Sequence, residues 1–425
     1  MRRIEQRGQA ITVELDGDPV PAFDGEPVAL SLLAAGETVF ARSIKYHRPR
    51  GPYCFAAACS HCLMRVDGVP NIYTCRIPAR AGMRLERQNA YPSVKVDVFQ
   101  SIDWLFPRGL DHHAMFAGVP VAEQVMAKVA RHLAGLGLLP DKPAPDRMPC
   151  ETLRVKVAVA GGGASGSSAA ARLAAQGVPF LLLERDPFLG GRRFSAPDLP
   201  RDQVRLRTPV IGLYEDDAGW YLAAVSAADA SEPRLLKVYA ERFLLAVGGH
   251  PPTLPFENNE LPGVFSGRAA TSMLRRHGLL IAEEPALVGR GPELAELQRL
   301  LESHGAKIAA VVDVDGDAKD LKAHGRNKVN GLSFARRGRR KKVDCDAILV
   351  SVPISPSFEL ARQGGARVSW SPPHRTFVVE AAADGRTHAA FPLYVSGELT
   401  APHAPEESAK SGELAADAIA REARP

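Results

Sequence analysis

The sequence predicts an α/β protein in which a small cysteine-bearing domain precedes two folds of the dinucleotide-binding type. Three observations support this prediction. Four cysteines lie within residues 54–75, a glycine-rich turn between two apolar strands begins at Gly161, and a second, incomplete glycine-rich turn begins at Gly289. The length of 425 residues also suits about three domains.

The composition is that of an ordinary globular protein. Hydrophobic residues make up 45% and charged residues 24% of the chain, which is enough for a sizeable core. The formal net charge of +5 is small for this length and does not indicate a nucleic-acid partner. The start of the chain lacks the apolar stretch of a secretory signal, and no run reaches the roughly 18 apolar residues of a membrane span. We therefore expect a cytoplasmic protein with no membrane span.

The cysteines are spaced Cys54-x4-Cys59-x2-Cys62-x12-Cys75. A plant-type [2Fe–2S] cluster uses a C-x4-C-x2-C loop and a fourth cysteine downstream. The sequence VDG at 66–68 predicts a hairpin turn that returns the chain to the site. All four cysteines are candidate metal ligands for such a cluster. A zinc site, a disulfide pair and a redox-active CxxC remain open as alternatives.

The elements before the cysteines follow the order of a β-grasp ferredoxin. Residues 10–16 alternate like a strand, and residues 27–36 form a short amphipathic helix. Ferredoxin loops usually carry glycine beside the second cysteine, whereas this loop has Ala57, Ala58 and Ser60. We therefore expect the loop to use φ angles that alanine tolerates.

Five basic residues precede the cysteine loop, namely Arg42, Lys45, His47, Arg48 and Arg50. They form either a solvated basic loop or a contact to a phosphate or cofactor, since planar guanidinium groups suit phosphate oxygens. Lys45 and Arg48 are the candidate cofactor-binding residues of this run.

Residues 101–150 predict a connecting arm with a helix at about 120–136. His112 and His113 lie on it, and adjacent residues of an extended segment point to opposite faces, which favours a loop over a metal site. The two remaining cysteines, Cys150 and Cys345, are expected to be small buried thiols.

The first glycine-rich turn lies in a strand–turn–helix–strand setting. Gly161 permits the tight turn, Gly163 lets the backbone approach a pyrophosphate, and Gly166 allows close helix–strand packing. Glu184 ends the second strand, where a carboxylate accepts ribose hydroxyls and disfavours a 2′-phosphate. The residues predicted to bind the cofactor are Gly161, Gly163, Ala164, Gly166, Glu184, Arg185, Gly191, Arg192, Gly248, Gly397 and Glu398. Of these, the last two belong to a closing strand that precedes a helix starting near Ala404.

Residues 204–247 predict a small antiparallel meander between the two folds. The second glycine-rich turn keeps Gly289 and Gly291 but has Leu294 in place of the third glycine, so a Rossmann-like fold is expected there and nucleotide binding stays open. The basic run at 336–342 is expected to be a solvated hairpin tip.

Several segments together resemble one family. "RSIKYHRPRG", "QNAYPSVKVDV", "LAGLGLLPD", "AGGGASG", "LPGVFSGRAA" and "YVSGELT" resemble the α subunits of heterotetrameric sarcosine oxidase, and the subunits of hydrogen cyanide synthase and of opine and dye-linked proline dehydrogenases. Unlike the long sarcosine oxidase α subunits, this chain stops before the folate-binding half and keeps four cluster cysteines. It therefore looks like a fusion of the small ferredoxin subunit to the α subunit.

The resemblance implies an α/β flavoprotein with an N-terminal β-grasp [2Fe–2S] ferredoxin-like domain and two glutathione-reductase-like dinucleotide-binding domains. The implied bounds are 1–100 for the ferredoxin domain, 101–150 for the arm, 151–267 with 386–425 for the first nucleotide fold, and 268–385 for the second.

The resemblance also implies an electron-transfer subunit of a multi-subunit amine or amino-acid dehydrogenase or oxidase. In that family the amine site and FAD lie on a separate flavin-containing β subunit, FMN sits at the interface, and the α nucleotide fold holds FAD, NAD or ATP. The sequence identifies no catalytic residue and no electron acceptor. The alternative is a self-contained NADH-dependent reductase with the cluster as its exit, against which Leu294 argues.

Overall fold

The computed structural model describes residues 1–5, 8–101, 103, 121–122, 124–125, 128, 139–141, 148–226, 233–316 and 318–423. Two compact units divide the chain. Unit 1 comprises residues 1–144 with 253–352, and unit 2 comprises residues 145–252 with 353–425. The predicted residues His112 and His113, and most of the predicted helix at 120–136, lie outside the described part of the chain.

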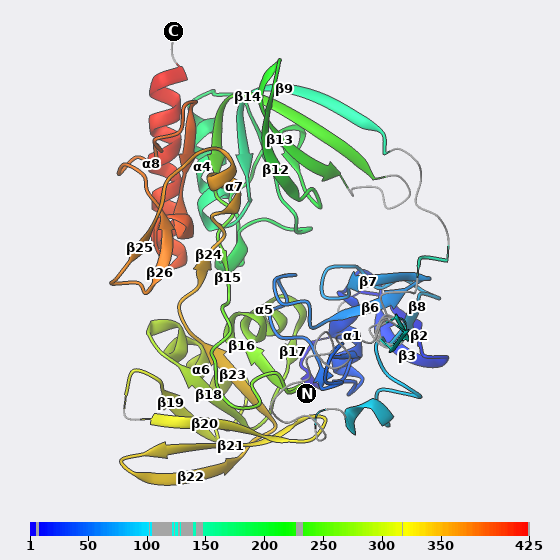
Figure 1. Ribbon diagram of the computed structural model, residues 1–425. Helices are drawn as coiled ribbons and strands as arrows, with labels where there is room; N and C mark the ends of the chain where they lie inside the picture. The colour runs from blue at the N-terminus through cyan, green and yellow to red at the C-terminus, as the bar shows by residue number, and fades with distance from the viewer. Residues whose placement is uncertain are drawn as a thin grey trace. The chain divides into compact units, whose positions relative to one another are not determined.

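The N-terminal part of unit 1 is a five-stranded sheet crossed by one helix (Figure 1). The strand order is β3-β2-β8-β6-β7, in which the β2–β8 pair is parallel and the other pairs are antiparallel. The elements are β2 (Ala10–Leu15), β3 (Asp18–Phe23), α1 (Val28–Ala34), β6 (Leu63–Val66), β7 (Val69–Tyr73) and β8 (Arg84–Glu86). The first strand, the helix and the turn between β6 and β7 stand where the sequence predicts them. This is the predicted β-grasp arrangement.

The second part of unit 1 is a four-stranded parallel sheet of order β16-β23-β18-β19. Its elements are β16 (Val264–Ser266), α5 (Gly267–His277), β18 (Pro285–Gly289), α6 (Pro292–Ser303), β19 (Ala310–Asp313) and β23 (Ala347–Ser351). Each strand is almost wholly apolar, as expected of a parallel sheet buried on both faces. The predicted second Rossmann-like fold is therefore present.

The two parts of unit 1 share a hydrophobic core. Leu30 and Leu33 of α1 belong to the same cluster of buried side chains as Met273 of α5 and Leu297 of α6. A short antiparallel pair joins the two parts as well, formed by β1 (Arg2–Arg3) and β17 (Leu279–Leu280). Two further short strands, β4 (Ala41–Arg42) and β5 (Pro49–Arg50), pair just before the cysteine loop.

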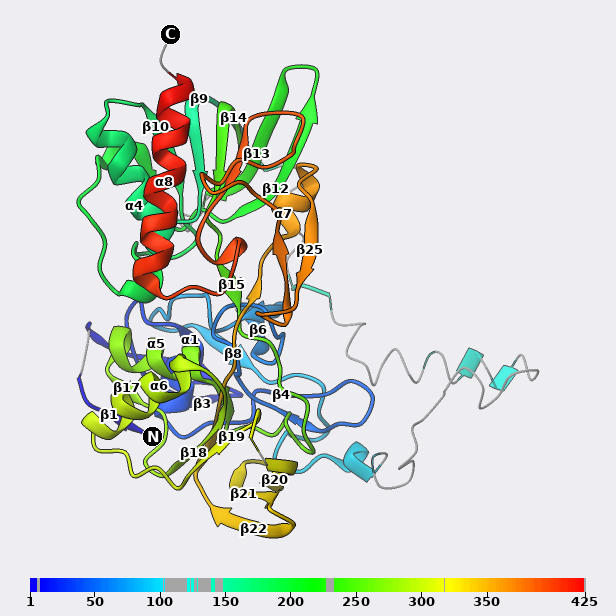
Figure 2. The same ribbon diagram turned by 90° about the vertical axis from the view of Figure 1, so that its left-hand side faces the viewer.

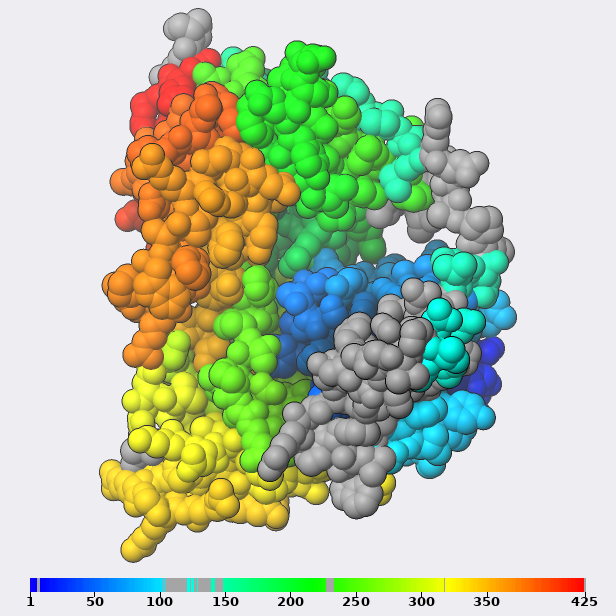
Figure 3. Space-filling model, in the orientation of Figure 1, coloured from blue at the N-terminus to red at the C-terminus, as the bar shows by residue number. Residues whose placement is uncertain are grey.

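A three-stranded antiparallel sheet completes unit 1. It consists of β20 (Ala318–Gly325), β21 (Val329–Arg336) and β22 (Arg339–Asp344). The basic run at 336–342 spans the turn between β21 and β22 and the outer strand, whose first four residues are exposed. The space-filling view shows this yellow hairpin projecting from the surface (Figure 3), in agreement with the predicted hairpin tip.

Unit 2 is built on a seven-stranded sheet. The strands β11, β10, β9, β14 and β27 are mutually parallel, and β13 and β12 extend the sheet as an antiparallel meander. Their bounds are β9 (Cys150–Ala160), β10 (Phe180–Leu183), β11 (Val204–Arg205), β12 (Val210–Asp216), β13 (Gly219–Ser226), β14 (Arg234–Leu245) and β27 (Leu393–Val395). Both the meander and the closing strand match the prediction.

Helices α4 (Ala164–Ala175) and α8 (Pro405–Ala423) run side by side on one face of this sheet (Figures 1 and 2). Val157 and Val159 of β9 pack toward these helices, whereas Ala158 and Ala160 belong to the core on the other face. The alternation follows from the two-residue period of a strand.

The remaining elements of unit 2 are one short strand before residue 252 and four elements after residue 353. They are β15 (Gly249–His250), β24 (Ser355–Pro356), α7 (Glu359–Gln363), β25 (Val368–Ser371) and β26 (Thr376–Val379). Since β24 pairs with β15, residues 353–385 group with unit 2, whereas the bounds expected from the sequence placed them in the second Rossmann-like fold. Among the described residues, no helix is long and apolar enough to cross a membrane.

Candidate cofactor sites

The cysteine loop joins β5 to β6, and the β6–β7 hairpin brings the fourth cysteine back to it. Leu63 of β6 pairs with Tyr73 of β7, so Cys62 and Cys75 lie at the same end of the hairpin. The thiols of Cys62 and Cys75 are hydrogen-bonded to each other, and those of Cys54 and Cys59 form a second such pair. The structure thus brings all four predicted ligands together as two pairs.

Backbone amides surround these sulfurs. The Sγ atom of Cys54 accepts hydrogen bonds from the N–H groups of Ala56 and Ala58, each at 3.3 Å. The Cys59 thiol, together with these amides, lowers the pKa of Cys54 to about 6. The pKa of Cys75 is lowered as well, mainly by its hydrogen bond from Cys62. The other thiol of each pair, Cys59 or Cys62, has its pKa raised by the same hydrogen bond and by burial. One sulfur of each pair therefore favours the thiolate, which is the form that binds metal.

The pairing of the thiols fits two irons better than one ion. A [2Fe–2S] cluster places four thiolates around two irons rather than one, whereas zinc needs four ligands around one point. The donor set, with amide N–H groups directed at sulfur, fits the iron–sulfur cluster.

One expectation about this loop was wrong. Ala57 and Ser60 adopt left-handed φ angles of +55° and +57°, and Phe55 has a φ of +49°. L-residues rarely adopt this conformation, which costs roughly 1–2 kcal/mol per residue. The loop therefore folds like a glycine-rich ferredoxin loop without its glycines, because the N–H groups must turn toward the sulfurs.

The basic run before the loop is not simply solvated. Arg42 is only 1% exposed, and its guanidinium donates to the carbonyl oxygens of Val94 and His47 and to Asn327. The imidazole of His47 is buried as well and pairs with Asp97 at 2.8 Å. Arg42 and His47 are therefore neither solvated nor open to a phosphate. They are buried and bonded to other parts of the chain.

The two predicted cofactor cations of this run differ in their surroundings. Lys45 lies 5.6 Å from the ring centroid of Tyr46. Arg48 is held by two carboxylates, with its Nη2 atom 2.8 Å from Asp103 and its Nη1 atom 3.0 Å from Glu260. A phosphate would have to compete with both carboxylates for Arg48.

In unit 2 the three glycines of the first glycine-rich turn meet different demands. Gly161 has a φ of +96°, and a Cβ atom on Gly166 would lie 1.8 Å from the carbonyl oxygen of Gly161. Both positions therefore require glycine for the fold. Gly163 has an ordinary φ of −66°, and a Cβ atom there would meet nothing within 4 Å. Nothing within the described protein needs glycine at 163, and its backbone at the start of α4 is open to close approach.

The other predicted residues of unit 2 gather around this turn. A Cβ atom on Gly191 would lie 3.0 Å from the Cα atom of Gly163. Arg192 pairs with Glu398 at 2.8 Å, and the Glu398 carboxylate also lies 3.5 Å from a Cβ position on Gly248. Gly397 starts the 3₁₀ turn that carries Glu398, and its own Cβ position touches Ser165. Ala164, the first residue of α4, is buried, whereas Arg185 is exposed.

Glu184 lies at the end of β10 and turns toward the glycines. Its carboxylate accepts hydrogen bonds from the N–H groups of Gly162 at 2.5 Å and Asp186 at 2.7 Å. Burial raises the pKa of this carboxyl group, which is 8% exposed.

The second glycine-rich turn is built differently. A Cβ atom on Gly289 would lie 1.8 Å from the carbonyl oxygen of Ser351, as in a Rossmann-like turn. Leu294, however, is buried in the core of unit 1. Glu293 in the first turn of α6 pairs with Arg268 at 2.7 Å, so this helix start already faces a carboxylate, which repels phosphate.

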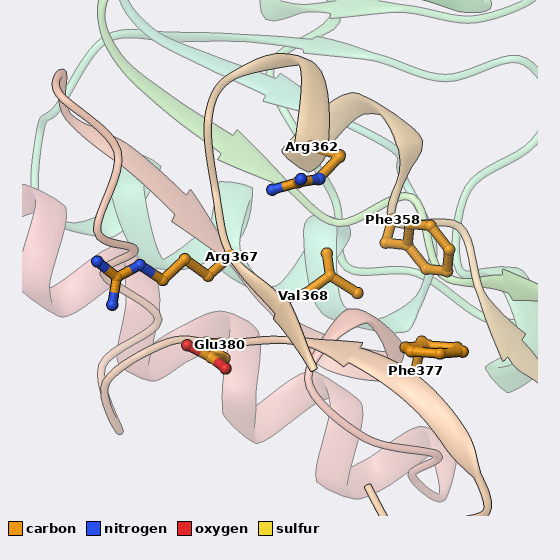
Figure 4. Close-up of a pocket in the computed structure, with 6 residues that line it drawn as sticks. All are labelled: Phe358, Arg362, Arg367, Val368, Phe377 and Glu380. Atoms are coloured by element: carbon orange, nitrogen blue, oxygen red, sulfur yellow. The ribbon is translucent and has the colours of Figure 1, made fainter. Parts of the chain in front are cut away.

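A separate cavity of about 420 Å³ lies in unit 2 beside the β25–β26 hairpin (Figure 4). Phe358 and Phe377 form one side, the charged Arg362, Arg367 and Glu380 lie on the other, and Val368 lies between. None of the predicted cofactor residues lines it. Of the remaining cysteines, Cys345 is buried as predicted, whereas Cys150 at the start of β9 is exposed, contrary to the prediction.

The folds and sites together define a flavoprotein-like chain that carries a ferredoxin-type [2Fe–2S] domain. Residues 8–90 match the family of 2Fe-2S iron-sulfur cluster binding domains, and residues 159–220 match NAD(P)-binding Rossmann-like domains. The chain belongs to the family of sarcosine oxidase α subunits, hydrogen cyanide synthase and opine oxidase subunits, with a fused [2Fe–2S] domain.

Three comparisons illustrate this membership. The sarcosine oxidase subunit alpha of Rhizobium meliloti (strain 1021) is 26% identical over 99% of this chain and 47% of its own length. The hydrogen cyanide synthase subunit HcnA of Pseudomonas aeruginosa is 35% identical over 19% of this chain and 75% of its own length. The crystal structure of L-proline dehydrogenase from P.horikoshii aligns with a TM-score of 0.72 at 21% identity, covering 98% of this chain and 74% of that one, and shares the fold. This chain spans less than half the length of the sarcosine oxidase subunits that it matches.

Proposed function

We propose that this chain is the electron-transfer α subunit of a multi-subunit, flavin-dependent dehydrogenase or oxidase of amines or amino acids. The observation that carries the proposal is the presence in one chain of a paired four-thiol site and an open glycine cradle at Gly163. Relatives named as sarcosine oxidase and opine oxidase subunits support the oxidation of a CH–NH group. A flavin takes two electrons at once and a [2Fe–2S] cluster carries one, so the pair would convert a two-electron oxidation into single-electron steps.

The chain's own residues have defined parts in this proposal. The sulfurs of Cys54, Cys59, Cys62 and Cys75 hold the cluster. The start of α4, reached across Gly163, binds the pyrophosphate of FAD, NAD or ATP, and Glu184 accepts the ribose hydroxyls. Arg192 and Glu398, fixed by their own ion pair, border that site.

Substrate oxidation is assigned to a flavin-containing β partner, with an FMN at the interface and Lys45 and Arg48 as its candidate phosphate contacts. Because Arg48 is held by Asp103 and Glu260, Lys45 is the more available of the two cations. An NADH-dependent reductase is the less favoured alternative, since Leu294 and Glu293 fill the start of the second fold with the chain's own groups.

The test is a visible spectrum with metal, sulfide and nucleotide analysis of the purified chain. We expect iron and acid-labile sulfide in about a 1:1 ratio, two of each per chain, with one bound nucleotide. Co-purification with a flavin-containing partner should be required for amine-dependent reduction of the cluster. One zinc with no sulfide would refute the cluster, and reduction by NADH without a partner would support the reductase instead.

A further inference from the structure

The cavity beside the β25–β26 hairpin has an aromatic wall that is left partly open to solvent. The rings of Phe358 and Phe377 meet edge to face with their centroids 6.4 Å apart, and Trp370 packs on Phe377 in the same way at 5.3 Å. Phe377 is nevertheless 49% exposed and Trp370 52% exposed. Aromatic rings in this position can cover the apolar part of a ligand, and they favour edge-to-face contacts with another ring.

Charged groups stand on the other side of the cavity (Figure 4). Arg362 belongs to α7, Arg367 directly precedes β25 and Glu380 directly follows β26. Within the described part of the chain, the side chains of Arg367 and Glu380 make no hydrogen bond or ion pair. Arg362 donates to the carbonyl oxygen of Ala366 at 3.5 Å and has no charged partner there. Charges of both signs are therefore open to a ligand.

Arg367 and Glu380 are neighbours across the hairpin. The backbone N–H of Glu380 donates to the carbonyl oxygen of Arg367 at 2.9 Å, which continues the pairing of Val368 with Val379. Residues directly opposite each other in an antiparallel pair hold their Cβ atoms about 4.5–5.5 Å apart. A cation and an anion at this spacing, which do not bind each other, are placed to bind the two charged ends of one small dipolar molecule.

We propose that this cavity binds an α-amino acid with an aromatic or other large apolar side chain. The guanidinium groups of Arg362 and Arg367 hold its carboxylate, and Glu380 holds its ammonium group. The rings of Phe358 and Phe377 cover its side chain. A simple carboxylic acid would be repelled by Glu380 and a simple amine by two guanidinium groups, so the mixed charges favour a zwitterion. The volume of about 420 Å³ lies within the range of about 300–1,000 Å³ usual for small-molecule sites.

This binding site is separate from the proposed redox function. None of the residues proposed to hold the cluster or the nucleotide lines the cavity. An amino acid bound here is therefore a ligand of the chain and not the substrate of the proposed dehydrogenase or oxidase. The inference depends neither on the cluster nor on the nucleotide site.

The experiment is isothermal titration calorimetry of the purified full chain with L-phenylalanine and two analogues. L-phenylalanine should bind saturably. 3-Phenylpropanoate, which lacks the ammonium group, and phenethylamine, which lacks the carboxylate, should each bind at least about tenfold more weakly, since each loses its charge-assisted hydrogen bonds to one side of the cavity.

Variants of the two opposed residues should separate the two charged ends of the ligand. Glu380→Gln should weaken L-phenylalanine binding about tenfold without weakening the binding of 3-phenylpropanoate, whereas Arg367→Gln should weaken the binding of both about tenfold. The matched control is Arg375→Gln, which removes the same charge from the turn of the same hairpin, outside the cavity lining. It should leave both affinities within about twofold of wild type.

Absence of saturable binding of millimolar L-phenylalanine to the folded wild-type chain would overturn the proposal. Equal affinities for L-phenylalanine and 3-phenylpropanoate would overturn it as well, because Glu380 would then not recognise an ammonium group. A chain that binds L-phenylalanine as expected but lacks iron and nucleotide would refute the proposed redox function and leave this site standing.

Discussion

At the scale of single residues, the cluster loop adopts strained backbone angles, and these angles direct N–H groups to a cysteine sulfur. Phe55, Ala57 and Ser60 hold positive φ angles, and the N–H groups of Ala56 and Ala58 between them donate to Cys54. Strain of this kind persists only where surrounding structure fixes the backbone, and it concentrates at functional sites. Here the four cysteines supply that constraint.

This strain predicts opposite effects for two adjacent glycine substitutions. Ala57→Gly relieves a left-handed conformation, which roughly cancels or exceeds the entropic cost of glycine of about 0.5–1 kcal/mol. Ala58→Gly, where φ is not positive, should cost that entropy without relief. In urea unfolding followed by cluster absorbance, Ala57→Gly should be at least as stable as wild type and Ala58→Gly less stable. Equal destabilisation of both variants would contradict the account.

Two glycines of the first nucleotide fold should respond differently to substitution. Gly166 is required by the fold, whereas Gly163 is proposed to be required by a ligand. Gly163→Ala places its Cβ in open space and should leave the unfolding midpoint unchanged while reducing bound nucleotide in the purified protein. Gly166→Ala places its Cβ against the carbonyl oxygen of Gly161 and should destabilise the protein by about 1–3 kcal/mol. Full nucleotide retention in both Gly163→Ala and the bulkier Gly163→Val would show that the pyrophosphate does not lie there.

At the scale of elements, the sequence predicted what is local and missed what is distant. The strand, turn and helix around Gly161 were predicted because apolar periodicity and glycine spacing encode them directly. The burial of Arg42 was missed because its partner Asn327 lies 285 residues away in sequence. For the same reason, the basic run gave no sign that Arg48 would be held by Glu260, 212 residues away.

The contact between α4 and α8 includes one ion pair that predicts a pH dependence. Asp417 accepts from Arg172 at 2.7 Å, and this hydrogen bond holds the pKa of Asp417 below its usual value of 3.8. A lowered pKa in the folded state contributes stability above the unfolded pKa, and this contribution is lost as the pH falls through the folded value. Because the pair is solvent-screened, Asp417→Asn should reduce the free energy of unfolding by at most about 1 kcal/mol at pH 7.

The measurement is chemical denaturation of wild type and Asp417→Asn at pH 7 and near pH 3. The difference between the two proteins should shrink at the lower pH, where the wild-type carboxylate begins to take up its proton. A difference that grows on acidification would show that Asp417 acts by some route other than its ion pair with Arg172.

At the scale of the whole molecule, the described residues include the candidate cluster ligands and a candidate nucleotide site, and we propose that substrate oxidation lies on a partner. The cavity of Figure 4 is lined by side chains of Phe, Val, Arg and a single Glu, and none of the predicted cofactor residues borders it. We therefore expect the isolated chain, supplied with flavin and an artificial acceptor, not to oxidise sarcosine, proline or an opine. Turnover appearing only after addition of a flavin-containing partner would agree with the subunit assignment. Steady turnover by the chain alone would refute it.

The core shared by α1, α5 and α6 limits how this protein can be taken apart. The relative HcnA matches 79 residues, or 19% of this chain, and 75% of its own length, so it is a much shorter protein. In this protein, however, the leucines of α1 interdigitate with those of the neighbouring Rossmann-like layer, and the first residues of the chain add a strand to it. Removing the cysteine-bearing part would expose the buried apolar side chains of α5 and α6 to solvent. We therefore expect the two parts of unit 1 to fold together, so grafting a foreign ferredoxin onto this scaffold would require redesigning both sides of the shared core.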